Sequence, residues 1–387
     1  MWGVKPAKRT KFCKKFRSFA VKLNATSLKF LLNLKKLAFM PRRWYTVTDM
    51  TLREYLENYA PRYRGHTPGH KGSADSRDIT EILDVFPADL ITKAETRAAA
   101  LYGARAVRFL VGGSSAGIKA AVLSSAKRGI VTDAYAHIAV DGAAALAKLP
   151  LYKLPLRVGA DGLPELSDAA GITAAMRESG ADCAVVQYPD YYGRVPDLEA
   201  IYEAVKSEGG TLICDSAHGA HFALRPDLFP PSANTLSDMC NMSAHKTLGA
   251  MTQTAFLVFG RGGDEEKTDR ALSDLGTTSP NYILLASLER CVDDAERIKP
   301  LYDGLKKFSD GMKSRFPHSD NADFTRLVLD FGNKGRQAAY AFYDRGIVAE
   351  KYDDRYTVFI LTPYDDADSL ECLAEATEAV CRETRVK

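Results

Sequence analysis

Short apolar runs alternate with helix-like segments from about residue 95 onward. In the intervening segments, apolar residues recur every three or four positions, as in DLEAIYEAVKSEGG, or small residues dominate, as in AVDGAAALAKL. This alternation predicts an α/β fold: a mostly parallel sheet with helices on both faces. The runs that suit buried strands are AVRFLV, GIVTD, DCAVVQY, TLICD, DMCNMS and TQTAFLVFG.

The pattern changes after Gly276. A long helical stretch, YILLASLERCVDDAERIKPLYDGLKKF, is followed by two strand-like runs, FTRLVLDFG and RYTVFILTPYD, each leading into a helical segment. We therefore expect a large domain over residues 50–285 and a smaller C-terminal α/β domain over 290–387.

The N-terminal segment differs in charge from the rest of the chain. Its first 43 residues hold 13 Lys or Arg and no acid. This basic leader, 1–45, suits a membrane-surface helix, a transit peptide, or an appended segment outside the fold. We favour the last interpretation, because Thr51 resembles the N-cap of a helix with which the fold would begin.

Charge and cysteine content narrow the class of protein. The net charge of +3 comes from the leader, and the remainder has 39 basic against 49 acidic residues, which disfavours nucleic-acid binding. The sequence contains no run of about 18 apolar residues, so it predicts no membrane span. The seven cysteines lack a C-x-x-C pair and lie mostly in apolar segments, as in a reduced, cytoplasmic protein.

Polar residues follow several of the predicted strands, where doubly wound sheets bind their ligands. GGSSAG, residues 112–117, offers Ser114, Ser115 and free helix-start amides to a phosphate, although a serine N-cap on an ordinary helix explains it about as well. Asp215 ends one apolar run, and Lys246 follows the next, with no charged residue nearer in sequence than Asp238 and Arg261.

A phosphate site, a buried acid and a buried lysine match the needs of pyridoxal 5′-phosphate. The lysine forms a Schiff base, the acid keeps the ring nitrogen protonated, and the helix start holds the phosphate. His137, after the second strand, is a candidate to stack on the ring or simply to cap a helix. Asp215, His218 and His221 alternatively suit a metal site, but that interpretation leaves Lys246 and the serines without a role.

Six segments, in this order, resemble the signature segments of the Orn/Lys/Arg decarboxylase family. They are HTPGHKG, GGSSAG, PDYYGRVPDL, DSAHGAHF, SAHKTLGAMTQTAFL and TTSPNYILLASLE, and the resemblance covers about residues 50–290. It implies a major domain of the aspartate-aminotransferase type (fold type I), a pyridoxal phosphate cofactor, and a homodimer or higher homo-oligomer with shared active sites.

The resemblance also implies the roles of individual residues. Lys246 is the Schiff-base lysine and Asp215 the partner of the ring nitrogen, while Thr277 reaches the neighbouring subunit's phosphate. Apart from the resemblance, the chemistry of the reaction makes His245 or Lys246 the proton donor to Cα, with no choice between them from the sequence, and His137 the candidate to stack on the ring. The remaining cofactor-binding residues are Ser114, Ser115 and Ala116 at the phosphate, with His218 and Ser243 nearby.

This chain departs from the family pattern in three places. Ile138 and Ala139 follow His137 where the family usually has Lys and Ser, Ser216 stands where a glutamate is often found, and the sequence ends at Lys387, before the additional C-terminal domain common in the family would be expected. The expected reaction is decarboxylation of lysine, ornithine or arginine, with an aminotransferase or another pyridoxal phosphate lyase as the alternative. The choice of decarboxylation rests on the resemblance, because the cofactor serves all of these reactions.

Overall fold

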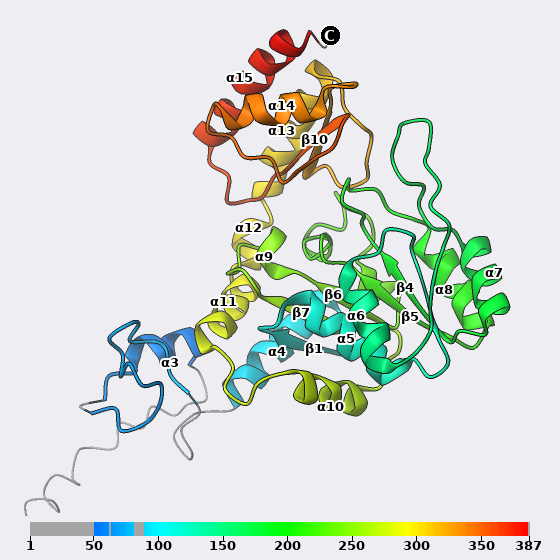
Figure 1. The fold of residues 1–387 in the computed structure, drawn as a ribbon. Coiled ribbons are helices and arrows are strands. Elements are labelled where there is room, and N and C mark those ends of the chain that lie inside the picture. Colours follow the sequence, from blue (N-terminus) through cyan, green and yellow to red (C-terminus); the bar gives the residue numbers. More distant parts are fainter. Residues whose placement is uncertain (1–49, 62, 81–88, 386–387) are drawn as a thin grey trace, which may run out of the picture. The chain divides into compact units, whose positions relative to one another are not determined.

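The computed structural model describes residues 50–61, 63–80 and 89–385, within a compact unit that runs from Met50 to Lys387 (Figure 1). The predicted leader, 1–45, lies outside the described residues. The first described helix, α3 (Leu52–Asn58), begins at Thr51 as predicted. The Thr51 hydroxyl accepts from the backbone N–H of Glu54, and the Glu54 carboxylate accepts from that of Thr51, so this capping box fixes the start of the helix.

A seven-stranded sheet forms the centre of this unit, as the alternating pattern predicts. All strands run parallel except β7, which is antiparallel to both neighbours. β6 and β7 are buried along their whole length, which explains their continuous apolar sequences. The order is β1 (Ala106–Leu110), β7 (Ala255–Phe259), β6 (Met239–Met242), β5 (Thr211–Asp215), β4 (Cys183–Gln187), β2 (Ile130–Thr132) and β3 (Leu151–Lys153).

Helices connect these strands and cover the sheet. Each of three helices begins where an Asp side chain accepts a backbone N–H of the first turn: Asp168 for α7, Asp197 for α8 and Asp264 for α10. α5 packs against α6 and α10, and α7 packs against α8. The bounds are α4 (Asp89–Tyr102), α5 (Gly113–Ser125), α6 (Ile138–Ala147), α7 (Ala169–Ser179), α8 (Leu198–Ser207), α9 (Ala244–Thr247) and α10 (Glu265–Leu275).

The long helical stretch after Gly276 is divided into three helices, α11 (Tyr282–Asp293), α12 (Ala295–Ile298) and α13 (Leu301–Arg315). Pro300 explains the last division, because proline has no backbone N–H to donate within a helix. Asp294 is at once the C-cap of α11 and the N-cap of α12. The helical structure predicted from the apolar periodicity is thus confirmed, but the stretch is not one continuous helix.

A second, three-stranded antiparallel sheet follows, in the order β8 (Arg326–Asp330), β10 (Tyr356–Ile360) and β9 (Lys351–Tyr352). It is accompanied by α14 (Gly335–Tyr343) and α15 (Ala367–Thr384). Val328 and Val358 of this sheet pack in one apolar cluster with Leu163 and Tyr192, which come from the earlier part of the chain. Through this cluster, the start of β8 is held near the ends of β4 and β5.

Candidate active site

The carboxyl ends of β5 and β6 and the start of α5 surround a cavity of about 190 Å³. This is the region where the sequence predicts ligand binding. Eight of the expected site residues line it: Ser114, Ser115, His137, Asp215, His218, Ser243, His245 and Lys246. Further lining residues are Gly113, Ile118, Gln187, Pro189, Tyr191 and Ala217.

One end of the cavity is formed by the N-terminus of α5. The helix already begins at Gly113, so most of GGSSAG is its first turn and not a loop. Gly113 has φ +71°, a backbone conformation that side chains other than glycine rarely adopt. The N-cap, Gly112, provides no side-chain cap, and the hydroxyl oxygens of Ser114 and Ser243 lie 2.9 Å apart. Free amides and hydroxyls at a helix start suit an anion.

Asp215, at the end of β5, provides the acid of the cavity. Its side chain is 6% exposed, and one carboxylate oxygen accepts from the backbone N–H of Ala217 at 3.2 Å. Burial raises the pKa of Asp215, while the Ala217 amide, Lys246 and His137 oppose that rise. A bound cation at this carboxylate would therefore stabilise its ionised form.

Lys246 lies in the four-residue helix α9, immediately after β6. Its Nζ atom lies 3.0 Å from Nε2 of His218 and 5.5 Å from the ring centre of Tyr191. Burial lowers the pKa of Lys246, an effect that Asp215 opposes. The lower pKa favours the neutral, nucleophilic amine that condenses with an aldehyde.

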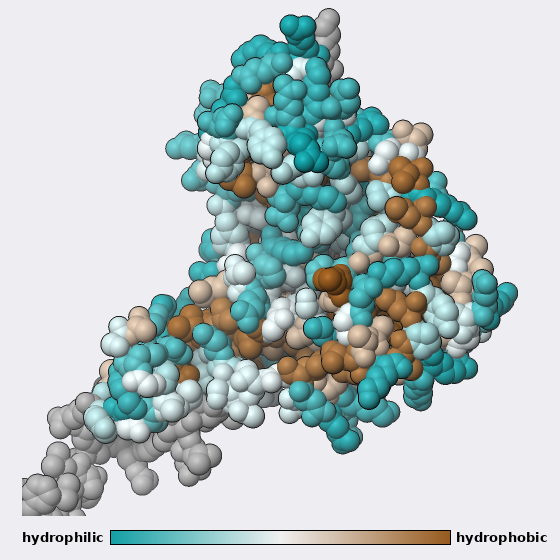
Figure 2. Space-filling model, in the orientation of Figure 1, coloured by the Kyte–Doolittle hydropathy of each residue, from teal (hydrophilic) through white to brown (hydrophobic). Residues whose placement is uncertain are grey.

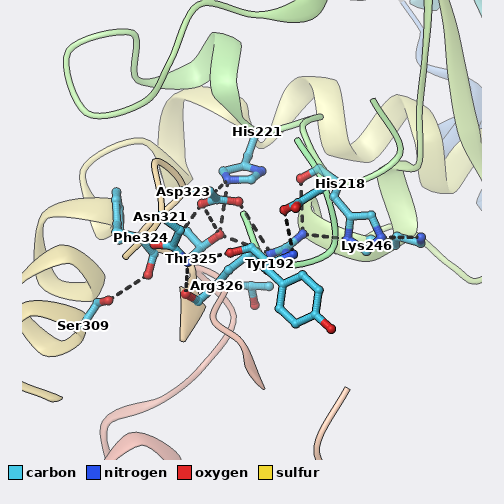
Figure 3. Close-up of polar contacts among 12 residues, drawn as sticks. Tyr192, His218, His221, Lys246, Ser309, Asn321, Asp323, Phe324, Thr325 and Arg326 are labelled. Carbon is cyan, nitrogen blue, oxygen red and sulfur yellow. Dashed lines mark hydrogen bonds and ion pairs between the residues drawn. The ribbon is translucent and has the colours of Figure 1, made fainter. Parts of the chain in front are cut away.

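His218 is held on its other side by Arg326, the first residue of β8 (Figure 3). Nη2 of Arg326 lies 3.0 Å from His218 Nδ1 and 3.2 Å from the His218 carbonyl oxygen. Arg326 is 0% exposed, and its Nη1 lies 3.8 Å from a carboxylate oxygen of Asp323. Arg326 is not among the site residues predicted from the sequence, although an arginine inside the apolar run FTRLVLD was a signal for it.

The two other candidate histidines have distinct settings. His137 is exposed and caps α6, its Nδ1 accepting from the backbone N–H of Ala139 at 3.1 Å, yet it also lines the cavity. His245 Nδ1 lies 2.8 Å from the carbonyl oxygen of Thr254. Because a carbonyl only accepts, Nδ1 of His245 carries the hydrogen, and in the neutral ring Nε2 has the lone pair.

Two expected cofactor-binding residues do not line the cavity. Ala116 lies in the first turn of α5, and Thr277 is an exposed residue whose hydroxyl accepts from the backbone N–H of Ser279. The role expected for Thr277 involves a second subunit, so its absence from the cavity of one chain leaves that role a prediction.

The alternative metal site does not assemble. His221 Nε2 lies 3.2 Å from Asp323, whereas His218 lies between Lys246 and Arg326. The contacts of these two histidines are thus with residues other than Asp215. Within the described part of the chain, no group of three or more His, Cys, Asp or Glu side chains could hold a metal ion.

Four other motif residues have defined surroundings. Tyr191 lines the cavity, whereas Tyr192 donates its hydroxyl hydrogen to Asp353. In HTPGHKG, His70 lies 3.0 Å from Asp78 and does not line the cavity. The Ser216 hydroxyl is buried without a hydrogen-bond partner among the described residues.

The parallel sheet with one antiparallel strand and the cavity at its strand ends place the chain among the α/β enzymes of pyridoxal phosphate fold type I. The chain belongs to the Orn/Lys/Arg decarboxylase family: the family model described as "Orn/Lys/Arg decarboxylase, major domain" matches residues 73–310. The match includes the segments that carry Ser114, Asp215 and Lys246.

Individual relatives agree with this assignment. YaaO of Bacillus subtilis, an uncharacterized protein, is 32% identical over 55% of this chain and 46% of its own length. An arginine decarboxylase of Bacillus anthracis is 26% identical over 79% of this chain and 70% of its own length. The structure of the constitutive lysine decarboxylase of Escherichia coli has a TM-score of 0.71 at 17% identity, covering 86% of this chain and 60% of that one. The chain thus spans only part of these proteins.

The residues in the cavity fit pyridoxal 5′-phosphate. The uncapped start of α5 suits the phosphate, and the buried Asp215 needs the positive charge that a protonated ring nitrogen provides. Lys246 presents a partly buried amine to the same cavity. Together with the family, these residues indicate pyridoxal phosphate as the cofactor.

Proposed function

We propose that this chain is a pyridoxal phosphate-dependent decarboxylase of a basic amino acid, releasing carbon dioxide and a diamine or agmatine. The observation that carries the proposal is the convergence of Lys246, Asp215 and the Ser114–Ser243 pair on one cavity. Relatives named arginine decarboxylase and a structural neighbour named lysine decarboxylase support the substrate class. An aminotransferase or another lyase is the alternative.

Each residue has a defined task in this proposal. Lys246 attaches the cofactor, Asp215 balances the charge of its ring nitrogen, and Ser114, Ser115 and Ser243 hold its phosphate. Pyridoxal phosphate supplies an electron sink for the bond broken at Cα. His137, an exposed residue that lines the cavity, is the residue proposed to stack on the ring.

The proton that Cα needs after loss of carbon dioxide comes from His245 or Lys246. His245 keeps Nδ1 bound to the Thr254 carbonyl, so Nε2 is the atom that exchanges a proton. Burial lowers the pKa of Lys246, which favours the exchange of a proton by its amine.

The test is incubation of the loaded full-length protein with lysine, ornithine or arginine. We expect carbon dioxide together with cadaverine, putrescine or agmatine from one of these substrates, and no product from the Lys246→Ala variant. Amine transfer that depends on an added keto acid, without carbon dioxide, would support the aminotransferase instead.

We also infer a homodimer or higher homo-oligomer in which Thr277 reaches the partner's phosphate. Apolar side chains gather on the face over α5 and α6 (Figure 2), and Ile138, beside the cavity residue His137, is 77% exposed. Leu146 of α6 is 50% exposed as well. Burial of such residues would favour association. Sedimentation of wild type and Ile138→Lys tests this, with a shift of the variant toward monomer expected.

The remaining assignments concern organisation and location. We propose that residues 50–285 form the cofactor domain and 290–387 the small domain, with 1–45 outside both. The cytoplasm is the proposed compartment, because Cys183, Cys214, Cys240, Cys291 and Cys381 are buried, unpaired thiols. None of the described helices is long and apolar enough to cross a membrane.

A further inference from the structure

His218 contacts the side chains of both Arg326 and Lys246, and the chemistry of these contacts determines where its hydrogen lies. Arg326 has no acceptor, so its Nη2, 3.0 Å from His218 Nδ1, must donate to that nitrogen. In a neutral imidazole the hydrogen then belongs to Nε2. Burial, reinforced by Arg326, holds the pKa of His218 well below its usual value, which keeps the ring neutral.

The Nε2–H of His218 points at Lys246, whose Nζ lies 3.0 Å away. A protonated amine has no lone pair, so only neutral Lys246 accepts this hydrogen bond. We propose that Arg326 is a positioning residue that fixes His218 as the Nε2–H tautomer and thereby keeps Lys246 a neutral hydrogen-bond acceptor before the cofactor attaches. The inference rests on the proposed role of Lys246.

The other groups around Lys246 act in both directions. Asp215 and Glu350 raise the pKa of the amine, while burial, the largest influence, and the charge of Arg326 lower it. Tyr191 presents its ring to the amine and makes no ion pair with it. The hydrogen bond that His218 donates thus favours the neutral amine of Lys246. The carboxylates of Asp215 and Glu350 favour the protonated amine instead.

Arg326 is itself fixed by a buried network (Figure 3). Asp323 pairs with it at 3.8 Å and accepts from the Thr325 hydroxyl at 2.6 Å. His221 lies 3.2 Å from the same Asp323 carboxylate. Arg326 is the first residue of β8, and Asp323 lies three residues before it. The second sheet is therefore linked to the amine of Lys246 through Arg326 and His218.

The experiment measures the titration of Lys246 in the full-length protein after removal of the cofactor with hydroxylamine. Trace acetylation with acetic anhydride at a series of pH values, read by mass spectrometry, gives its apparent pKa relative to exposed Lys267. We expect Arg326→Met to raise this value by about one pH unit or more. In a His218→Phe background the same substitution should have a much smaller effect, because the hydrogen-bond path is gone.

Controls separate this path from plain charge repulsion and from loss of folding. Arg355→Met removes another arginine that pairs with an aspartate, Asp330, of the second sheet, and should leave Lys246 unchanged. Asp323→Asn with Arg326→Met removes both buried charges and should repeat the rise if Arg326→Met alone does not fold.

Three results would overturn the proposal. These are an unchanged Lys246 titration, an equal rise with and without His218, or ¹⁵N shifts of His218 in the unmodified apo-protein that place its hydrogen on Nδ1. The last measurement needs no variant. The acetylation titrations and the ¹⁵N shifts are measured without substrate, so they stand apart from a failure of the decarboxylase proposal. A raised KM with an unchanged Lys246 titration would instead make Arg326 a substrate-binding residue.

Discussion

The hydroxyl oxygens of Ser114 and Ser243 lie 2.9 Å apart, although 129 positions separate the two residues in the sequence. Ser114 stands in the first turn of α5, and Ser243 follows β6 as the N-cap of α9. The sheet brings these two ends together because β1 and β6 run in the same direction on either side of β7. The pair thus joins the phosphate end of the cavity to the segment that carries Lys246.

Ser114→Ala should weaken cofactor binding about tenfold, because one hydrogen bond to a charged group contributes roughly 1.5 kcal/mol. Titration of the cofactor-free protein with pyridoxal phosphate, followed by absorbance, gives the dissociation constant. The matched control is Ser124→Ala at the far end of α5, whose hydroxyl donates to the Ala121 carbonyl. Equal affinities for the two variants would contradict the assignment of the phosphate to the helix start.

Lys246→Ala should remove the visible absorbance that a lysine-linked pyridoxal phosphate gives, while leaving the far-ultraviolet circular dichroism unchanged. The reason is chemical: Lys246 is the lysine whose amine lines the cavity. Lys267→Ala, at an exposed position of α10, should keep the absorbance. Retention of the band in the Lys246 variant would show that another group holds the cofactor.

Asp215→Asn should reduce turnover by about a hundredfold, because a neutral amide cannot balance a protonated ring nitrogen and a charged hydrogen bond is worth up to about 3 kcal/mol. Cofactor content, measured after denaturation, should fall much less, since the phosphate contacts remain. A wild-type turnover in this variant would remove Asp215 from the mechanism.

The sequence predicts those parts of the site that follow from local pattern. Asp215 ends an apolar run and Lys246 follows another, so a parallel sheet must bring them to one edge. Arg326 could not be placed in this way, because it comes from the second sheet, and its contact with His218 spans 108 positions. Likewise, β3 is only three residues long, with one half-buried and two exposed positions, so it carries no apolar run.

The stability of the fold should depend on pH through Asp323, and the contacts of Asp323 with His221, Thr325 and Arg326 determine the sign of this dependence. Burial alone would raise its pKa, but the charges of His221 and Arg326 and the hydrogen bonds outweigh it, so the pKa falls to about 2 from 3.8. An acid with a lowered pKa stabilises the fold above its unfolded value and loses that contribution as the pH falls. The contribution of about 2 kcal/mol should therefore disappear between about pH 4 and pH 2.

Asp323→Asn tests this directly, because the amide does not titrate in that range. Near neutral pH the variant should be less stable by roughly 3 kcal/mol, since Arg326 is left buried without its counter-charge. Urea unfolding at successive pH values should show the gap to wild type narrowing below about pH 4. Asp320→Asn changes an exposed carboxylate of the same segment and should give almost no gap at any pH. A gap for Asp323→Asn that stays constant down to pH of about 2 would mean that Asp323 is not held ionised by Arg326 and His221.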